Sequence, residues 1–245
     1  MKKRLLSMLL LLAATATGAW ALTQDGDGYY LLSTAQDLTD FAVLVNSGSN
    51  TANAKVTQDI TLTGTWSGIN NYNGTFDGQG HTISGVSGNC GLFAFIGSDG
   101  TVKRVIVDGS IYSGDGAGGI ANSNAGTITR CGFIGSVGGG RDTNNGYVAG
   151  IAAYSSGQVS HCFNRGTVSA RYVGGIVGRL GEAGTVRYCY NAGQLSMDYI
   201  KVSSAIVGDR YGSVSNCYTL EGSAQHHGSE GVSGDVKPAE QFASG

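Results

Sequence analysis

Residues Gly175–Leu195, which read GIVGRLGEAGTVRYCYNAGQL, carry a pattern that recurs along this 245-residue chain and indicates its fold. Each copy opens with a small residue and an aliphatic one, and three further columns follow it. Self-similarity at a period of roughly 20–50 residues is the signature of a solenoid. Over five units the columns are Gly91-Leu92, Gly119-Ile120, Gly150-Ile151, Gly175-Ile176 and Ala205-Ile206; Val102, Ile128, Val159, Val186 and Val214; Val105, Cys131, Cys162, Cys189 and Cys217; and Ile111, Val137, Val168, Leu195 and Ser223.

The spacing inside a unit indicates the path of the chain. Two mostly polar residues, such as Lys103-Arg104 and Thr129-Arg130, separate the second column from the third. Strict alternation in a flat strand would bury one of them, so the three-residue spacing predicts a bend with both outside. Asn164-Arg165-Gly166 and Asn191-Ala192-Gly193 predict further corners. Because parallel crossovers are right-handed in nearly all proteins, we predict an all-β fold, a right-handed parallel β-helix of about five recognisable rungs.

The two ends of such a solenoid need covers. Residues 33–46 predict an amphipathic capping helix, with Ser33 and Gln36 as a capping box and Gly48 at the C-terminal cap. Irregular entry strands are expected over 54–62, 74–76 and 81–86. The stretch Lys237–Phe242 resembles a helix opening that stops early, so we expect residues 223–245 to be a mobile, incomplete cap.

The first 21 residues predict export. Lys2, Lys3 and Arg4 precede a short apolar run, and Ala19-Trp20-Ala21 fits a signal-peptidase site. Without those three cations, the remaining 12 basic and 17 acidic residues give a net charge of −5, which argues against nucleic-acid binding. We expect a secreted or cell-surface protein with no membrane span in its mature chain, because no later apolar run approaches 20 residues.

The repeat resembles that of bacterial GLUG-motif proteins. Gly175-Ile176-Val177-Gly178 matches the motif, and Gly184–Leu195 matches its continuation G-x-V-x-x-C-Y-N-x-G-x-V with leucine in the last place. The entry segment is similar too, most clearly in the turn Tyr72–Ile83 (YNGTFDGQGHTI). The resemblance implies a β-helical module of large exported surface proteins, some of them peptidases with a separate catalytic domain. It does not imply lyase chemistry, because a fold does not carry a function.

These observations divide the chain into five parts. They are a signal peptide, a polar neck with the capping helix, entry strands, the GLUG-type repeats and a C-terminal tail. The expected bounds are 1–21, 22–54, 55–90, 91–223 and 224–245.

Four cysteines share one repeat column, which predicts a buried structural ladder of Cys131, Cys162, Cys189 and Cys217. Rung spacing allows a disulfide, but parallel Cβ vectors aim the sulfurs badly, so we favour free thiols that pack as small apolar groups. Cys90 lies outside the ladder and is expected to be the most reactive. No metal site is expected, because no C-x-x-C pair occurs and a ladder is not a tetrahedron.

Carboxylates and histidines are the next candidates for chemistry. Asp77, Asp108 and Asp115 are the best acids for a β-helix lyase or glycosidase, yet none repeats on the next rung to form a cluster. His81 and His161 are isolated. Asp25–Gly28 resembles the start of a calcium-binding loop but lacks the remaining ligands of one. Gly114–Gly119 fits the dinucleotide-binding pattern G-x-G-x-x-G, but it lies at a repeat corner rather than between a strand and a helix. We therefore expect neither a cofactor nor intrinsic catalysis.

Aromatic columns offer a binding surface instead. Phe163, Tyr190 and Tyr218 follow the cysteine column and predict a structural stack. Tyr147 and Tyr172 share another position. A structural ladder is the favoured interpretation there too, and the alternative is an exposed row that stacks on sugar rings, which makes both tyrosines candidate surface binding residues. The loop 138–146 lengthens one unit and adds further candidates, since insertions in solenoids often lie on a binding face. These are Arg141, Asn144 and Asn145.

Two function classes remain open from the sequence. One is a non-catalytic surface module for adhesion, spacing, or contact with glycans or with host or cell-surface proteins. The other is a carbohydrate-active β-helix enzyme that uses aspartate carboxylates. The absence of a repeated acidic cluster favours the first, and the sequence leaves the ligand and the oligomeric state undecided.

Overall fold

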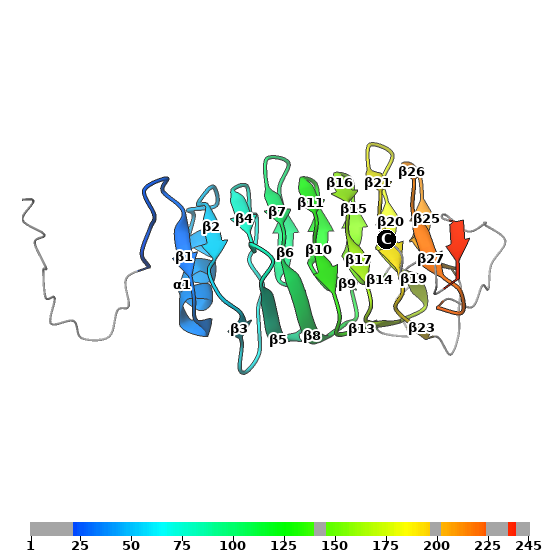
Figure 1. Cartoon of the computed structure of the whole chain (residues 1–245), viewed down its shortest axis with the longest axis horizontal. Helices are drawn as coiled ribbons and strands as arrows, with labels where there is room; N and C mark the ends of the chain where they lie inside the picture. Colours follow the sequence, from blue (N-terminus) through cyan, green and yellow to red (C-terminus); the bar gives the residue numbers. More distant parts are fainter. Residues whose placement is uncertain (1–21, 140–145, 197–201, 224–234, 239–245) are drawn as a thin grey trace, which may run out of the picture.

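The computed structural model describes residues 22–139, 146–196, 202–223 and 235–238. They form a right-handed parallel β-helix of about seven turns with one short helix at its N-terminal end (Figure 1). The fold class predicted from the repeat is therefore confirmed. The structure has more turns than the five that the repeat reveals, because the first turns are built from sequence without the repeat pattern. The expected signal peptide, residues 1–21, lies outside the described residues.

Four parallel sheets line the rod: sheets A and B include strands of the first turns, sheet C begins at β6 (Phe93–Ile96) and sheet D at β9 (Ala117–Gly118). From β9 onward, each turn of the chain visits the sheets in the order D, C, A, B. Sheet A contains β1 (Tyr30–Leu32), β2 (Ala54–Val56), β4 (Thr75–Asp77), β7 (Thr101–Lys103), β11 (Thr127–Thr129), β16 (Gln158–Ser160), β21 (Thr185–Arg187) and β26 (Ser213–Ser215). Sheet C contains β6 (Phe93–Ile96), β10 (Ala121–Asn124), β15 (Ala152–Ser155), β20 (Val177–Leu180) and β25 (Val207–Arg210). Sheet D contains β9 (Ala117–Gly118), β14 (Tyr147–Ala149), β19 (Tyr172–Gly174) and β24 (Val202–Ser204).

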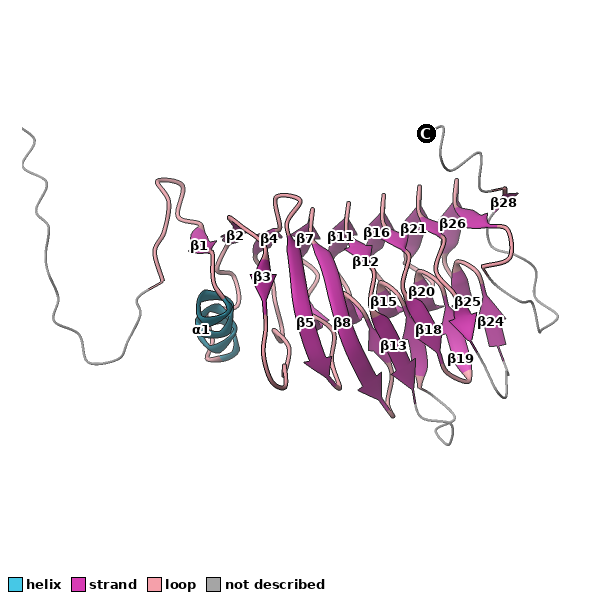
Figure 2. Ribbon diagram, turned by 60° about the horizontal axis from the view of Figure 1, so that its bottom comes forward, coloured by secondary structure: helices cyan, strands magenta, loops and turns pink. Residues whose placement is uncertain are grey.

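Sheet B is the largest of the four and takes two strands from most of the repeat turns. It contains β3 (Ile60–Thr61), β5 (Thr82–Gly88), β8 (Ile106–Ser113), β12 (Gly132–Phe133), β13 (Ser136–Gly139), β17 (Phe163–Asn164), β18 (Thr167–Ser169), β22 (Tyr190–Asn191), β23 (Leu195–Ser196), β27 (Tyr218–Leu220) and β28 (Asp235–Lys237). Figure 2 shows β5 and β8 as the longest strands, each replacing two short strands of later turns.

The repeat columns superpose from turn to turn. Ile128 pairs with Val159, and Val159 pairs with Val186, all with fully buried side chains. The register expected from the sequence is therefore confirmed for this column. Val214, its last member, is only partly buried, because it belongs to the last strand in the sheet.

The bend expected between the second and third columns is also confirmed. At each bend the residue before the third column adopts a left-handed backbone with φ between 51° and 55°. This conformation lets one residue turn the chain while its side chain points outward. Left-handed residues other than glycine cost roughly 1–2 kcal/mol. The members of this column are Arg104, Arg130, His161, Tyr188 and Asn216.

Glycine opens four of the five repeats, and Ala205 opens the fifth, because the chain is crowded at the corner between sheets D and C. A Cβ on Gly175 would lie 2.0 Å from the Ala205 carbonyl oxygen and 2.6 Å from Cγ of Asn191. Asn191 belongs to a fully buried amide stack, in which Nδ2 of Asn164 donates to its Oδ1 at 2.8 Å. Each of these two side chains also accepts from the backbone N–H two residues later, which fixes the two corners that the sequence predicted.

Helix α1 (Ala35–Asn46) covers the N-terminal end of the core with a buried face of Leu38, Phe41, Ala42 and Val45. The predicted helix is confirmed, but the expected capping box is one residue out of place. Thr34 is the N-cap, and Asp37 completes the box.

At the other end, β28 pairs in parallel with β27 and includes Lys237, where a helix opening was expected. That part of the prediction is wrong, because the backbone groups of β28 complete a strand ladder. The rest of the expected cap and its mobility concern residues outside the described ranges. Across the described chain, no helix has the length and apolarity required to cross a membrane.

Candidate functional site

The outer corner between sheets D and C gathers the candidate binding tyrosines. Tyr147 and Tyr172 are in-register neighbours, and their ring centroids are 5.1 Å apart. Tyr154 on sheet C meets Tyr147 edge to face at 5.5 Å. The expectation of an exposed aromatic row is wrong, because Tyr147 and Tyr172 are each only 7% exposed. The rings of Tyr147, Tyr154 and Tyr172 pack against one another, and this packing shields Tyr147 and Tyr172 from solvent.

An ion pair between Arg179 and Asp209 packs against the Tyr147 side chain at this corner. The Tyr147 hydroxyl donates to Oδ2 of Asp209 at 2.8 Å, and Nε of Arg179 lies 3.5 Å from the same oxygen. The Arg179 guanidinium also lies 5.7 Å from the centre of the Tyr147 ring and 5.2 Å from that of Tyr211. Burial and the bond to Asp209 raise the pKa of Tyr147. Arg179 and Asp209 are direct register partners in neighbouring strands. Aligning the repeats could therefore have predicted this ion pair, which was not expected from the sequence.

Arg141, Asn144 and Asn145, the remaining candidate binding residues, lie outside the described residues. The second aromatic column is described, and it stacks as expected. The rings of Phe163 and Tyr190 are nearly parallel, with centroids 5.5 Å apart. Lys237 lies 3.8 Å from the ring centre of Tyr218, the next member of the column. Stacked rings cover one another's faces, so this column is better suited to stabilising sheet B than to binding a flat ligand.

The cysteine ladder is buried and free of disulfides, as the sequence predicted. Each ladder thiol lies within 3.2–3.3 Å of the carbonyl oxygen two residues before it, and the four Sγ atoms therefore follow one repeated geometry. Burial raises the pKa of Cys162, which keeps this thiol protonated and inert. Cys90, which we expect to be the most reactive of the five, is itself buried: it is 4% exposed, and burial raises its pKa to about 12. Its reactivity relative to the ladder thiols stays a prediction.

Asp77, the best catalytic candidate, is used as a structural clamp. Its Oδ1 accepts from Nε of Arg104 at 2.9 Å and from the Gln79 backbone N–H at 3.0 Å. Its Oδ2 accepts from Nη2 of Arg104, and Nζ of Lys103 lies 3.5 Å away. Desolvation by burial opposes ionisation, but the Arg104 and Gln79 bonds outweigh it and lower the pKa of Asp77. These contacts fix the Tyr72–Ile83 turn and occupy both carboxylate oxygens.

The other candidate acids and bases lie on separate parts of the rod. Asp108 is in β8 of sheet B, whereas Asp115 is exposed in the turn between β8 and β9. His81 contacts Asp59 at 3.2 Å, and His161 stacks on Tyr188 with ring centroids 5.1 Å apart. Within the described residues, no group of three or more His, Cys, Asp or Glu side chains is placed to hold a metal ion.

The calcium-like segment Asp25–Gly28 already holds a cation of the protein itself. Nζ of Lys55 lies 2.6 Å from Oδ2 of Asp25, 3.8 Å from Oδ2 of Asp27 and 4.3 Å from the Tyr29 ring centre. Asp25 also accepts from the backbone N–H groups of Asp27 and Tyr29. This arrangement fastens the neck to β2, and it explains the two aspartates without a metal.

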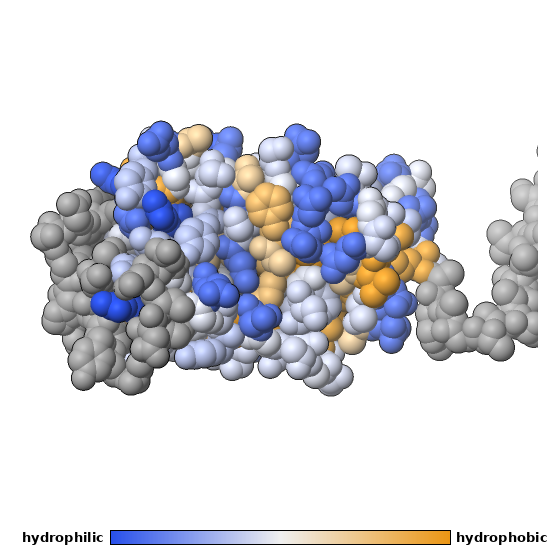
Figure 3. All heavy atoms as spheres, turned by 180° about the vertical axis from the view of Figure 1, so that it is seen from behind, coloured by the Kyte–Doolittle hydropathy of each residue, from blue (hydrophilic) through white to orange (hydrophobic). Residues whose placement is uncertain are grey.

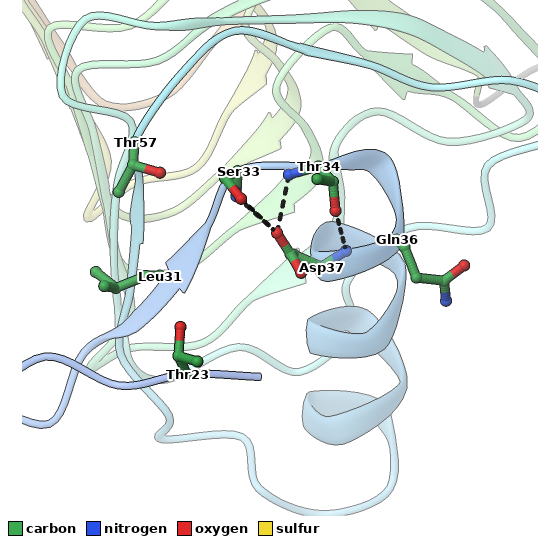
Figure 4. A pocket seen from close by; sticks show the side chains of 7 residues that line it. All are labelled: Thr23, Leu31, Ser33, Thr34, Gln36, Asp37 and Thr57. Carbon is green, nitrogen blue, oxygen red and sulfur yellow. Dashed lines mark hydrogen bonds between the residues drawn. The ribbon is translucent and has the colours of Figure 1, made fainter. Parts of the chain in front are cut away.

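An open recess of about 720 Å³ lies beside the N-terminus of α1 (Figure 4). A helix N-terminus attracts anions, but Asp37 fills this one. Its Oδ2 accepts from the Ser33 N–H, the Ser33 hydroxyl and the Thr34 N–H, each at 2.9 Å. The remaining lining is hydroxyl, amide and aliphatic, from Thr23, Leu31, Thr57 and Gln36. This recess is therefore unsuited to a phosphate or carboxylate.

A second recess, of about 460 Å³, lies at the opposite end of α1, between the helix C-terminus, the loop 67–71 and β6. Four asparagines dominate its lining: Asn46, Asn50, Asn70 and Asn71. Elsewhere the surface is mixed. The face in Figure 3 is mainly hydrophilic, with hydrophobic residues gathered near the N-terminal end and in a narrow central band.

Comparisons with known proteins support the fold. No protein-family model matches the chain, and no curated protein matches it. A solved structure described as a candidate immunoglobulin A1 protease from Bacteroides ovatus is similar, with a TM-score of 0.65 and 21% identity over 90% of this chain and 87% of that one. A second, named IgA1 protease, gives a TM-score of 0.52 and 14% identity, and the match covers 84% of this chain but only 21% of that one.

Proposed function

We propose that this chain is a non-catalytic β-helical module of an exported bacterial protein, related to GLUG-motif repeat modules, that contacts glycans or proteins at a cell surface. The observation that carries this proposal is the set of hydrogen bonds made by Asp77, the best catalytic candidate. Both oxygens of Asp77 are engaged by neighbours of the same chain. A catalytic carboxylate needs an oxygen within hydrogen-bond reach of a substrate.

The distribution of the remaining acids supports the same proposal. Asp77, Asp108 and Asp115 lie in sheet A, in sheet B and in the turn before sheet D, respectively. Polysaccharide cleavage by a carboxylate pair requires separations of roughly 5–10 Å across one bond. Placement of the three acids on three different elements of the rod does not favour such a pair.

The second structural neighbour supports a modular role. The match to this β-helix covers only 21% of that chain, so a rod of this kind occurs there beside a much larger remainder. We propose that a β-helix beside a larger remainder supplies a rigid spacer and a lateral surface, and that it does not itself cleave peptide bonds. We propose the same spacer and surface-contact role for the present chain.

The test uses the mature chain, residues 22–245, in two parallel measurements. Binding is measured on arrays of glycans and host-matrix proteins, and turnover is measured on acidic polysaccharides and on immunoglobulin A1. We expect weak binding that is strengthened by multivalent display, and no turnover. Cleavage of either substrate class, lost in Asp77→Asn, Asp108→Asn or Asp115→Asn, would replace this proposal with the enzyme alternative.

A further inference from the structure

The asparagine-lined recess beside the C-terminal end of α1 has a rigid frame. Nδ2 of Asn46 donates to the Gly68 carbonyl at 3.1 Å, and its Oδ1 accepts from the Asn70 N–H at 2.8 Å. The Oδ1 of Asn70 accepts from the N–H of Asn71 at 3.0 Å. Both bonds of Asn46 join residues more than 20 positions apart, so they fix the helix to the loop 67–71.

The floor of the recess is closely packed. Gly68 has φ of 83°, and a Cβ there would lie 2.5 Å from Sγ of Cys90 and 3.1 Å from the backbone nitrogen of Ala94. Val45 and Ala94 add small aliphatic surface to the lining. The hollow is therefore bounded by packed atoms and two fixed loops rather than by long mobile side chains.

The recess presents polar groups that the fold does not use. Among the described residues, the side-chain amides of Asn50 and Asn71 have no hydrogen-bond partner, and Nδ2 of Asn70 and the Ser67 hydroxyl are also unpaired. A carboxamide offers a donor and an acceptor side by side. None of the lining residues carries a charge. These properties fit a ligand that is rich in hydroxyl groups and uncharged.

We infer that this recess is a binding site for a neutral saccharide unit of a glycan. Sugar hydroxyls both donate and accept, so side-chain amides match them, while the half-buried Ala94 suits the apolar C–H face of a ring. The volume lies within the range of small-molecule sites, roughly 300–1,000 Å³. The inference rests on the proposed function, because it names the ligand class for a surface-contact module.

The main test compares two substitutions at left-handed asparagines. Asn71 has φ of 52° and Asn216 has φ of 51°, both are exposed, and only Asn71 lines the recess. Glycine keeps this backbone conformation and removes the amide. Binding of the mature chain to neutral, sialylated and uronic-acid oligosaccharides is measured on an array and by ligand-observed NMR. We expect neutral sugars to bind, and Asn50→Ala combined with Asn71→Gly to weaken binding about tenfold. Asn216→Gly should leave it unchanged.

A second variant tests the volume rather than the amides. Ser67 is exposed at the rim, so Ser67→Trp fills the hollow without burying a new group in the core. It should abolish binding of the neutral sugar while the far-ultraviolet circular dichroism spectrum stays that of the parent.

The outcomes separate this inference from the proposed function. Sugar binding that is unchanged in both variants would disprove the assignment of the recess as the binding site, and it would leave the proposed surface-contact function unaffected. Preference for acidic sugars, or binding of unglycosylated proteins alone, would do the same. Turnover by the parent together with recess-dependent sugar binding would overturn the non-catalytic function and keep the recess.

Discussion

The entry turns, residues 22–90, and the repeat turns, residues 91–223, build one continuous β-helix from different side chains. In the entry turns a few large rings fill the core: Phe41 contacts Tyr72 and Phe76, each with a centroid distance of 6.2 Å. Both rings also lie 5.3 Å from Phe93, at the start of the repeat region. In the repeat turns most of the corresponding space is filled by stacked Val, Ile and Cys, together with the buried ring of Phe133.

The two regions therefore specify their packing in different ways. A core of large rings depends on the shape of individual side chains, so each ring matters greatly. A core of stacked small residues depends on register, because every position is supported by copies above and below it. Substitutions in the two cores should therefore differ in their cost to stability.

Val186→Asp tests the assigned register, because it places a charge at a position that should face the core. Val186 is fully buried between Val159 and Val214, so the new carboxylate would be desolvated without a partner. We expect a loss of more than about 4 kcal/mol in the free energy of unfolding, measured by denaturant titration. Arg187→Asp, at the exposed neighbouring position, is the control and should change stability by less than about 1 kcal/mol. A stably folded Val186→Asp protein would contradict the assigned register.

Phe41→Ala removes a ring from the entry core. Phe41 is fully buried on α1 and contacts three other rings, so its deletion should cost about 4 kcal/mol. Val43→Ala on the exposed face of the same helix provides the control. Equal effects of the two substitutions on the unfolding midpoint would show that the helix does not cover the core.

Gly175→Ala tests the crowded corner of the repeat. The added Cβ would lie 2.0 Å from a backbone oxygen that cannot move without shifting the next turn. We expect a loss of about 3 kcal/mol. Gly114→Ala adds the same methyl group where nothing lies within 4 Å and should be close to neutral in the same unfolding measurement. A tolerated alanine at position 175 would disprove the steric explanation of the motif glycine.

Asp77→Asn tests the clamp of the entry turn and its pH dependence. Loss of the charged hydrogen bonds to Arg104 should cost about 2 kcal/mol at neutral pH. The pKa of Asp77 is lowered in the folded state, so its contribution is present above the unfolded value of about 3.9 and lost as pH falls through the folded value. The difference in stability between parent and variant should therefore shrink below about pH 4. A constant difference from pH 7 to pH 2 would contradict the ionic clamp.

Cys162→Ala should have the smallest effect. The change deletes one sulfur from a ladder whose other members remain in place, and we expect a loss of about 1 kcal/mol. Thiol titration of the native protein gives an independent check, since all five cysteines are buried and should react only after denaturation. Rapid labelling of native protein would disprove the burial of the ladder.

The sequence predicted what repeats and failed where a contact depends on the shape of the whole turn. Val159, Val186 and the cysteine column recur, so their burial followed from alignment alone. The burial of Tyr147 did not follow, because a linear pattern does not reveal that Tyr154 and Asp209 of sheet C pack against its ring and hydroxyl. Lys55 was missed for the same reason: it reaches Asp25 across 30 positions in a region without repeats.

Among the candidate site residues, the sequence located the tyrosine column but not its surroundings. The asparagine-lined recess has no linear signature at all. Asn46, Asn50, Asn70 and Asn71 meet only because α1 ends beside the loop that leads to β4. Polar residues in two separate loops look alike in a sequence whether or not the fold brings them together.

The stacking of turns also has a mechanical consequence. The hydrogen bonds between neighbouring turns run along the rod, so a pull along its axis stretches the bonds of one interface at a time. Successive turns of the repeat comprise 26 to 31 residues. At roughly 3.5 Å per extended residue, each turn that peels away adds about 100 Å of chain. A rod of this design placed between a cell and its target would lengthen in discrete steps under load.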